Sequence, residues 1–289
     1  MAAEILDGRA LAADLRAEVA ARAERLRAAG AVPCLAVAIV GDDAASRGYV
    51  RTIERAGAHA GIEVRIAALP ATAGADALRA LLSTLGDDPA VHGVILQQPL
   101  PAHLAVREIA ESVPPHKDVD GANPVNLGRL AFASGTAFVP ATPMGCLLLL
   151  ERSKRWPLRG ARACVVGRSS VVGLPVALLL TARDATVTVV HRGTAELAHH
   201  TRDAEVLVAA TGVPGLIRAE HVMPGATVID VGTTYVDGKL VGDVAFDEVA
   251  AVAGEITPVP GGVGPVTNVA LMANVVTAAE RAQVKRERA

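Results

Sequence analysis

One segment indicates the class of this protein most directly: Val165-Val166-Gly167-Arg168-Ser169-Ser170-Val171-Val172-Gly173-Leu174-Pro175. An apolar run ends at Gly167, and Gly173 opens a segment of helical period, so the segment predicts a strand, a tight turn and a helix start. Free backbone N–H groups at such a helix start bind the pyrophosphate of a dinucleotide in Rossmann-type folds. The match is incomplete, because Ser169 stands where the G-x-G-x-x-G pattern has its second glycine.

The alternation of short β-rich runs with longer Ala/Leu/Arg-rich runs extends over the chain, which is typical of βα units around a parallel sheet. It occurs twice, on either side of a Pro/Thr-rich boundary at residues 139–143. Before the boundary we expect strands at 35–40, 63–68 and 91–96 and helices at 44–60 and 75–85. After it we expect strands at 163–166, 186–190, 206–209 and 227–231 and helices at 144–155, 173–182 and 266–281. The sequence therefore predicts a two-domain α/β protein.

Composition and charge narrow the class of partner. The chain has 289 residues, of which 51% are hydrophobic, enough to bury two cores. A net charge of −2 without a basic stripe, together with 2% aromatic residues, gives no footprint for nucleic acid. No apolar run approaches the roughly 20 residues of a membrane helix, and Glu4, Asp7 and Arg9 stand where a signal peptide would be apolar. We therefore expect a cytoplasmic protein with neither nucleic acid nor membrane as a partner.

The three cysteines argue against a disulfide and against a metal site. Cys34, Cys146 and Cys164 are odd in number, lie in apolar runs and lack the spacing of metal ligands. This pattern predicts reduced, buried thiols.

The strand after the glycine turn indicates which dinucleotide binds. Roughly 20 residues after the first glycine, an NAD site offers an acidic side chain to the ribose hydroxyl. Here Val190 is followed by His191 and Arg192, and no carboxylate is available. Arg168 and Arg192 suit the 2′-phosphate of NADP, so the sequence favours NADP over the alternative that two arginines on an Arg-rich chain are simply solvated surface.

Candidate substrate groups follow strands of the first half. Gln97 ends the run 93–96, and Asp120 lies in the polar stretch 117–121, so both fall where α/β sheets bind ligands. Ser46 and Tyr49 lie on the expected helix 44–60, and residues 258–267 form a glycine-rich loop between prolines. Taken singly, these features also fit a strand cap, a packing residue and a turn.

Their order along the chain is more specific. The following motifs occur in sequence: Ser46-x-x-Tyr49-Val50, Gln97-x-Pro99-Leu100-Pro101, Lys117-Asp118-Val119-Asp120-Gly121, Gly128-Arg129-Leu130, Thr142-Pro143-x-Gly145, Gly167-Arg168-Ser169-x-Val171-Val172-Gly173-x-Pro175, Asp230-Val231-Gly232 and Pro260-Gly261-Gly262-Val263-Gly264-Pro265-x-Thr267. In this respect the chain resembles the methylenetetrahydrofolate dehydrogenase/methenyltetrahydrofolate cyclohydrolase family, from about Ile5 to the last helix.

The resemblance implies an architecture and partners. It implies a folate-binding catalytic domain at 1–143 and 264–289, a Rossmann-type NADP-binding domain at 144–263 and a cleft between them. It also implies tetrahydrofolate one-carbon derivatives as substrates, NADP as cofactor, no metal and a homodimer.

The resemblance also implies roles for single residues. Asp120 would accept hydrogen bonds from the pterin, Tyr49 would pack against the folate, and Gln97 would orient the one-carbon centre. The other implied substrate-binding residues are Ser46, Pro99, Leu100, Gly262, Pro265 and Thr267. The implied cofactor-binding residues are Gly167, Arg168, Ser169, Val172, Gly173, His191, Arg192, Thr211, Gly212 and Thr233.

One departure from the family pattern concerns the chemistry. The family motif continues Ser-x-x-Tyr-Val-x-x-Lys, whereas this chain has Ile53 at the lysine position. Arg51 and Arg55 lie two positions either side and face other directions on a helix. Arginine is also a poor proton acceptor, because its pKa exceeds about 12.

The departure separates two steps of the implied reaction. Oxidation of methylenetetrahydrofolate is a hydride transfer that depends mainly on alignment, whereas hydrolysis of the methenyl product requires water addition and proton movement. We therefore hypothesise a dehydrogenase whose cyclohydrolase activity is weakened or lost. Two alternatives stay open: a bifunctional enzyme in which Gln97 and Asp120 position the water, and a non-catalytic folate or NADP binding protein.

Overall fold

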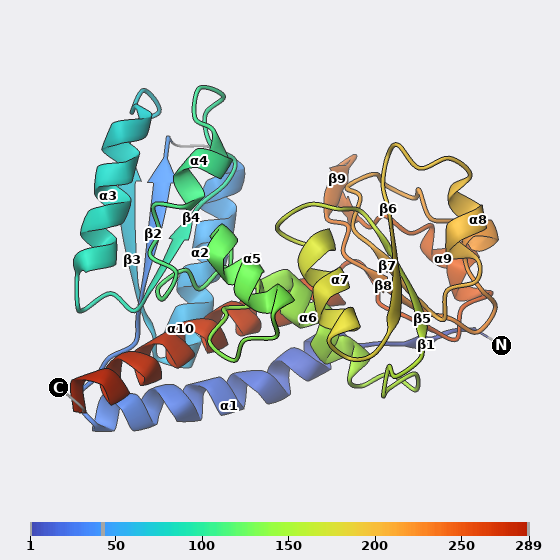
Figure 1. The fold of residues 1–289 in the computed structure, drawn as a ribbon, viewed down its shortest axis with the longest axis horizontal. Coiled ribbons are helices and arrows are strands. Elements are labelled where there is room, and N and C mark those ends of the chain that lie inside the picture. Colours follow the sequence, from blue (N-terminus) through green and yellow to red (C-terminus); the bar gives the residue numbers. More distant parts are fainter. Residues whose placement is uncertain (1, 42–43, 288–289) are drawn as a thin grey trace. The chain divides into compact units, whose positions relative to one another are not determined.

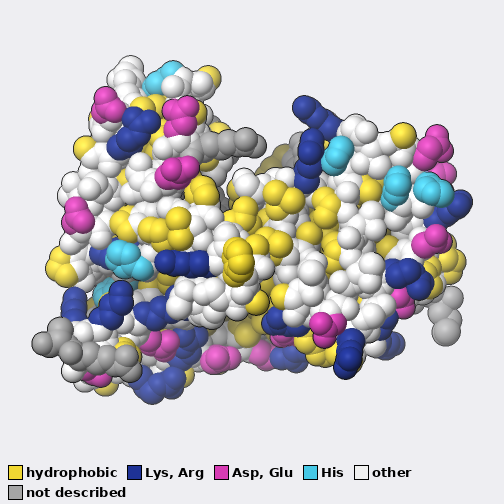
Figure 2. Space-filling view, in the orientation of Figure 1, with side chains coloured by type: hydrophobic (Ala, Val, Ile, Leu, Met, Phe, Trp, Pro, Cys, Tyr) yellow, Lys and Arg dark blue, Asp and Glu magenta, His cyan; other side chains and the backbone are white. Residues whose placement is uncertain are grey.

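The structure is a computed structural model that describes residues 2–41 and 44–287 (Figure 1). The chain divides into two compact units. Met1–Ala13 and Thr142–Thr267 form one, here called the six-stranded unit, and Asp14–Ala141 and Asn268–Ala289 form the other, the three-stranded unit. Basic and acidic side chains are interspersed on the face drawn in Figure 2.

The three-stranded unit contains a parallel sheet in the order β3-β2-β4, formed by Glu63–Leu69, Cys34–Val40 and Gly93–Leu96. Its helices are α2 (Ala44–Ala60), α3 (Ala75–Asp87), α4 (Val106–Ala110) and α5 (Pro124–Ala131). Alternate residues of β2 point to opposite faces. One face therefore packs its small side chains, such as Ala36 and Ala38, against Leu78 and Leu82 of α3.

Two long helices, α1 (Gly8–Ala28) and α10 (Val263–Glu287), contribute residues to both units. Within the three-stranded unit they lie side by side (Figure 1). Arg22 donates to Glu280 at 2.7 Å and to the hydroxyl of Thr277 at 2.8 Å. The guanidinium of Arg281 lies 4.7 Å from the ring centre of Phe138, so α10 is anchored to the unit by its polar face as well.

The six-stranded unit contains one parallel sheet in the order β1-β11-β8-β7-β5-β6. These strands span Glu4–Ile5, Glu255–Ile256, Thr227–Asp230, Val206–Ala209, Arg162–Val166 and Thr186–Val190. The remaining elements are α6 (Ala141–Leu150), α7 (Gly173–Thr181), α8 (Leu197–Thr201), the 3-10 turn η1 (Ala219–His221), the hairpin β9 (Thr234–Val236) and β10 (Lys239–Val241), and α9 (Phe246–Ala250). Helix α7 packs on β5 and β6, which positions the glycine turn between strand and helix.

The prediction of a two-domain α/β protein with a Rossmann-type sheet is confirmed. The predicted strands 186–190 and 206–209 agree with β6 and β7 residue for residue. Two helices were predicted wrongly at both ends by three residues or more: α6 spans Ala141–Leu150 and α10 spans Val263–Glu287. Helix α6 ends at Leu150 because Ser153 donates both its N–H and its hydroxyl to the Leu150 carbonyl, and α10 begins at Val263 because Pro265 is tolerated in a first helical turn.

The N-terminus belongs to the six-stranded unit, because the two residues of β1 pair with β11. The two compact units therefore differ from the predicted functional domains at the N-terminus. The assignment of residues 1–143 and 264–289 to a catalytic domain, and of 144–263 to a cofactor domain, stays a prediction.

All three cysteines are buried, as expected. Burial raises the thiol pKa of Cys34 to about 11 and those of Cys146 and Cys164 to about 12, so the thiols stay protonated at neutral pH. Across residues 2–41 and 44–287, none of the helices has the length and apolar character needed to cross a membrane.

Candidate active site

Four strand ends of the six-stranded unit lie at one edge of the sheet. Gly167 donates to the Val190 carbonyl, Ala210 to that of Val166, and Val231 to that of Ala209, at 2.8–2.9 Å. The ladder therefore continues one residue past β5, β7 and β8, with Val190, the last residue of β6, as the outermost acceptor. The segments that carry predicted cofactor residues start here, with His191, Gly167, Thr211 and Thr233, and the carboxyl edge of a parallel sheet is where such folds bind dinucleotides.

The glycine turn after β5 is packed so closely that it excludes side chains. Gly167 has φ +126°, and a Cβ on it would collide with the Ala210 carbonyl. A Cβ on Gly173 would collide in turn with the Gly167 carbonyl. Both glycines are thus required by backbone contacts, which is how a dinucleotide fingerprint brings its turn against the first turn of the helix.

Ser169, at the position of the second fingerprint glycine, caps the helix. Its Oγ accepts from the N–H groups of Val172 at 3.1 Å and Gly173 at 3.4 Å. These are amides that a helix start leaves free for a phosphate. The serine hydroxyl keeps its own proton as a donor, so the exposed turn still offers hydrogen bonds to an anion.

Two exposed arginines follow paired strand ends. Val166 of β5 is paired with Val190 of β6, so Arg168 and Arg192 lie two residues beyond one pairing. His191 stabilises the turn that follows β6 and contains Arg192, because its Nδ1 accepts a hydrogen bond from the N–H of Gly193 at 3.1 Å. Within the described ranges neither guanidinium forms an ion pair with a carboxylate. The residues present fit a dinucleotide with an added phosphate.

In the three-stranded unit, Gln97 and the Asp120 turn both flank β4. Gln97 follows β4, is 8% exposed, and donates from its backbone to the Ala38 carbonyl at 2.9 Å. Its side-chain Nε2 donates to the Gln98 carbonyl at 2.5 Å, which fixes the amide plane, and its side-chain oxygen accepts no hydrogen bond from residues 2–41 and 44–287. Pro99 is exposed, whereas Leu100 packs on the core.

The Asp120 turn is held by residues that sequence reasoning missed. Asp118 pairs with Val94 of β4, and its carboxylate accepts from Asn126 Nδ2 at 2.8 Å. Asn274 of α10 donates to the carbonyl of Val119 at 2.8 Å. Asp120 keeps part of its surface exposed in this turn, while removal from water and, second, the charge of Asp118 raise its pKa to about 7.

Helix α2 places Ile53 on its buried face. Ile53 is 1% exposed and shares a stripe with Val50, Gly57 and Ala60, at the spacing of an amphipathic helix. Arg51 and Arg55 are exposed, which confirms that they face other directions. The side chains of Ser46 and Tyr49 lie outside the described part of α2.

The glycine-rich loop before α10 is in close contact with the first residues of α1. Gly8 packs against the carbonyl of Gly262 so closely that a Cβ on Gly8 would collide with it, and a Cβ on Gly261 would lie 3.3 Å from Nε of Arg9. Thr267 donates its hydroxyl to the Val263 carbonyl at 3.2 Å. The glycines therefore serve packing in the six-stranded unit, and the predicted substrate contacts of Gly262, Pro265 and Thr267 stay predictions.

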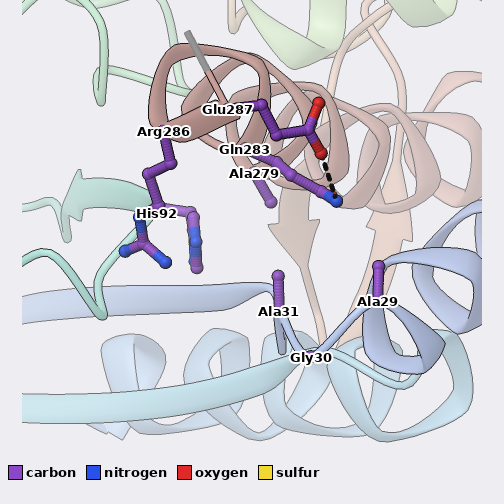
Figure 3. Close-up of a pocket in the computed structure, with 8 residues that line it drawn as sticks. All are labelled: Ala29, Gly30, Ala31, His92, Ala279, Gln283, Arg286 and Glu287. Atoms are coloured by element: carbon purple, nitrogen blue, oxygen red, sulfur yellow. Dashed lines mark hydrogen bonds between the residues drawn. The ribbon is translucent and has the colours of Figure 1, made fainter. Parts of the chain in front are cut away.

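A pocket of about 250 Å³ lies at the opposite edge of the three-stranded sheet (Figure 3). It is lined by His92, which directly precedes β4, by Ala31 and by the α10 residues Ala279, Gln283 and Arg286. Gln97 follows the other end of β4, so this pocket is separate from the predicted substrate residues.

A parallel sheet with such a glycine turn at its carboxyl edge is typical of dinucleotide-binding proteins of the Rossmann class. Family models assign the chain more narrowly. Residues 6–120 match the tetrahydrofolate dehydrogenase/cyclohydrolase catalytic domain, and residues 140–283 match the NAD(P)-binding domain of the same family. The chain therefore belongs to the tetrahydrofolate dehydrogenase/cyclohydrolase family.

Individual relatives cover nearly the whole chain. The bifunctional protein FolD of Parafrankia sp. is 52% identical over 275 residues, which cover 95% of this chain and 98% of that protein. The FolD structure from Campylobacter jejuni has a TM-score of 0.94 at 40% identity, covering 97% and 99% of the two chains. That of Trypanosoma brucei, complexed with NADP and an inhibitor, has a TM-score of 0.91 at 39% identity, covering 97% and 98%. The predicted cofactor is confirmed as a nicotinamide dinucleotide and agrees with the NADP in the trypanosomal structure.

Proposed function

We propose that this chain oxidises 5,10-methylenetetrahydrofolate to 5,10-methenyltetrahydrofolate with NADP and hydrolyses the methenyl product weakly or not at all. Family membership supports the dehydrogenase reaction. The observation that carries the second part is Ile53, an apolar side chain buried at the position where the family motif has its lysine.

The residues at the carboxyl edge of the six-stranded sheet would hold the cofactor. When bound, NADP supplies the nicotinamide that accepts a hydride from the one-carbon bridge. Ser169, at the start of α7, would donate its hydroxyl to the pyrophosphate. Gly167, which has no side chain, would let the pyrophosphate approach the backbone closely. Arg168 and Arg192 would pair with the 2′-phosphate, because guanidinium groups hold phosphate oxygens by charge-assisted hydrogen bonds.

The residues around β4 would hold the folate. The ionised carboxylate of Asp120 would accept hydrogen bonds from the pterin, since a carboxylate has only acceptors to offer. Gln97 is held by its own Nε2 bond, so its free oxygen has a defined direction for orienting the one-carbon centre. Orientation of this kind is what a hydride transfer needs most.

Hydrolysis makes a different demand on the protein. A water oxygen bonds to the methenyl carbon and the bond from that carbon to N5 breaks. One proton of the water goes to N5 and the other to solvent, giving 10-formyltetrahydrofolate. A positioned base or acid accelerates such a step by about 10²–10⁴-fold. Ile53 has no atom that accepts or donates a proton, so this acceleration would be missing.

One observation favours a second candidate, the fully bifunctional enzyme. The curated relatives named FolD are described as bifunctional, and Asp120, with a pKa raised to about 7, is a group that exchanges a proton near neutral pH. In that case Asp120 and Gln97 would position and deprotonate the water without a lysine.

We further propose a cytoplasmic homodimer, by resemblance to the family. Sedimentation at several protein concentrations tests the dimer, with a single monomer mass as the contrary result.

The two half-reactions are tested separately. With methylenetetrahydrofolate, we expect reduction of NADP faster than of NAD. With methenyltetrahydrofolate supplied directly, we expect its loss to match the rate in buffer. Nicotinamide that is never reduced would refute the dehydrogenase, and methenyl loss well above the buffer rate would favour the bifunctional candidate.

A further inference from the structure

Asp243 is a buried carboxylate aimed at the turn after β7. It lies two residues past β10, is fully buried, and belongs to none of the predicted site residues. Its Oδ2 accepts from the N–H and hydroxyl of Thr211 at 2.5 and 3.0 Å and from the N–H of Gly212 at 2.9 Å. One oxygen atom therefore gathers three donors of a single turn.

A second carboxylate holds Asp243 in place. Asp230, at the end of β8, accepts from the N–H of Asp243 at 2.9 Å and from that of Val244 at 3.0 Å. Room for the two carboxylates is made by glycine: a Cβ on Gly232 would collide with Asp243, and one on Gly242 with Asp230. This packing accounts for the Asp230-Val231-Gly232 motif, which the cofactor contacts alone leave unexplained.

The N–H and hydroxyl of Thr211 and the N–H of Gly212 are directed at Asp243. The Thr211 hydroxyl donates to Asp243 and accepts from the N–H of Val213 at 3.1 Å. Gly212, in contrast, is exposed, has φ +69° and has open space where a Cβ would stand. The carbonyl of Ala210, the residue before the turn, is the group that packs against Gly167. The Asp243 carboxylate thus holds the exposed backbone of Gly212 in place. It also stabilises the neighbouring segment whose Ala210 carbonyl packs against Gly167.

We propose that Asp243 is a positioning residue for the dinucleotide: it holds the Thr211–Gly212 turn in the shape that receives the cofactor. It acts through the turn, because its own side chain is buried and reaches no ligand. The proposal rests on the proposed NADP function and adds a residue, outside the predicted cofactor set, that determines cofactor affinity.

The test is calorimetric titration of purified protein with NADP, beside the melting temperature of each variant. Asp243→Ala leaves three donors without an acceptor and should raise the Kd for NADP by about tenfold or more. Asp243→Asn keeps an oxygen facing the turn and should recover most of the affinity. Thr211→Val removes the hydroxyl that donates to Asp243 and accepts from Val213, but keeps both backbone N–H bonds to Asp243. It should raise the Kd by roughly two- to tenfold, so the proposal stays testable if Asp243→Ala does not fold.

Glu255 provides a matched control at the amino edge of the same sheet. It is 3% exposed, and its carboxylate accepts from the N–H of Lys154 at 2.9 Å and from the hydroxyl of Thr227 at 2.8 Å. Glu255→Ala should therefore lower the melting temperature as Asp243→Ala does, yet leave the Kd for NADP unchanged.

Three results would decide against the proposal. Equal NADP affinity in the parent, Asp243→Ala and Thr211→Val would overturn it while leaving the proposed function intact. Equal losses of NADP affinity in Glu255→Ala and Asp243→Ala would show that the weaker binding follows from lower stability of the protein and not from the position of the Thr211–Gly212 turn. Absence of NADP binding in the parent protein would instead overturn the proposed function, and this inference with it.

Discussion

Ile53→Lys tests the connection between one buried side chain and the second half-reaction. Ile53 lies on the buried stripe of α2, and α2 begins shortly after the carboxyl end of β2. Side chains on a helix lean toward its N-terminus, so an amine introduced at this position would extend toward the carboxyl edge of the sheet. Gln97 follows the neighbouring strand β4 at that edge, so the amine would enter the predicted substrate region.

The size of the effect follows from the burial of Ile53. Removing the proton of a lysine of ordinary pKa, about 10.4, costs about 4.6 kcal/mol at pH 7, which is the upper limit for a fully buried amine. A long stem that reaches the edge of the sheet lowers this cost, so we expect a loss of about 2–5 kcal/mol in the free energy of unfolding. The same burial lowers the pKa of the amine toward neutrality, where it serves as a base, and should raise methenyl hydrolysis by about 10²–10⁴-fold.

The assay follows the loss of methenyltetrahydrofolate against a buffer blank, with NADP titration to show that each variant is folded. Ile53→Met, which has a similar length without the amine, serves as the control and should hydrolyse at the parent rate. The reasoning would be refuted by an Ile53→Lys protein that binds NADP with parental affinity and hydrolyses no faster than Ile53→Met.

Three further outcomes follow from the site. The carboxyl of Asp120, with its pKa raised to about 7, is protonated below that pH and becomes an acceptor above it, so the KM for methylenetetrahydrofolate should fall as pH rises through 7. The same pH series on Asp120→Asn should give a flat KM. Gly167→Ala should abolish measurable NADP binding in calorimetry, because its Cβ meets the Ala210 carbonyl, whereas Gly160→Ala, also at positive φ but with open space, should bind normally. Arg192→Gln should raise the KM for NADP by about tenfold or more through loss of a charge-assisted bond and leave that for NAD unchanged, and equal changes for both cofactors would contradict the 2′-phosphate assignment.

Local sequence signals were sufficient for strands β5 to β8 and for the glycine turn, but they did not predict the two-residue strands β1 and β11. The apolar run Val206–Ala209 gave strand boundaries that agree with the structure, because a buried parallel strand requires an uninterrupted apolar run. The two glycines of the turn were predictable from their spacing, although only Gly173 is needed by a local contact, with the Gly167 carbonyl, whereas Gly167 itself meets the carbonyl of the distant Ala210.

Contacts between distant residues were not predictable in this way. Asn274 donates to the carbonyl of Val119, 155 positions earlier, and Asp243 binds a turn 32 positions earlier, so no local pattern marks either residue. The loop 258–267 shows the same limit: its glycines indicated a close approach, but only the fold identified Gly8 as the group that approaches.

The most direct test of the account is the product of the parent enzyme with methylenetetrahydrofolate and NADP. Folate products are separated and quantified over time while nicotinamide reduction is followed in the same reaction. The account predicts that methenyltetrahydrofolate accumulates in step with NADPH and converts to the formyl product no faster than in buffer. Formyl product that keeps pace with NADPH, without a methenyl build-up, would contradict the role assigned to Ile53.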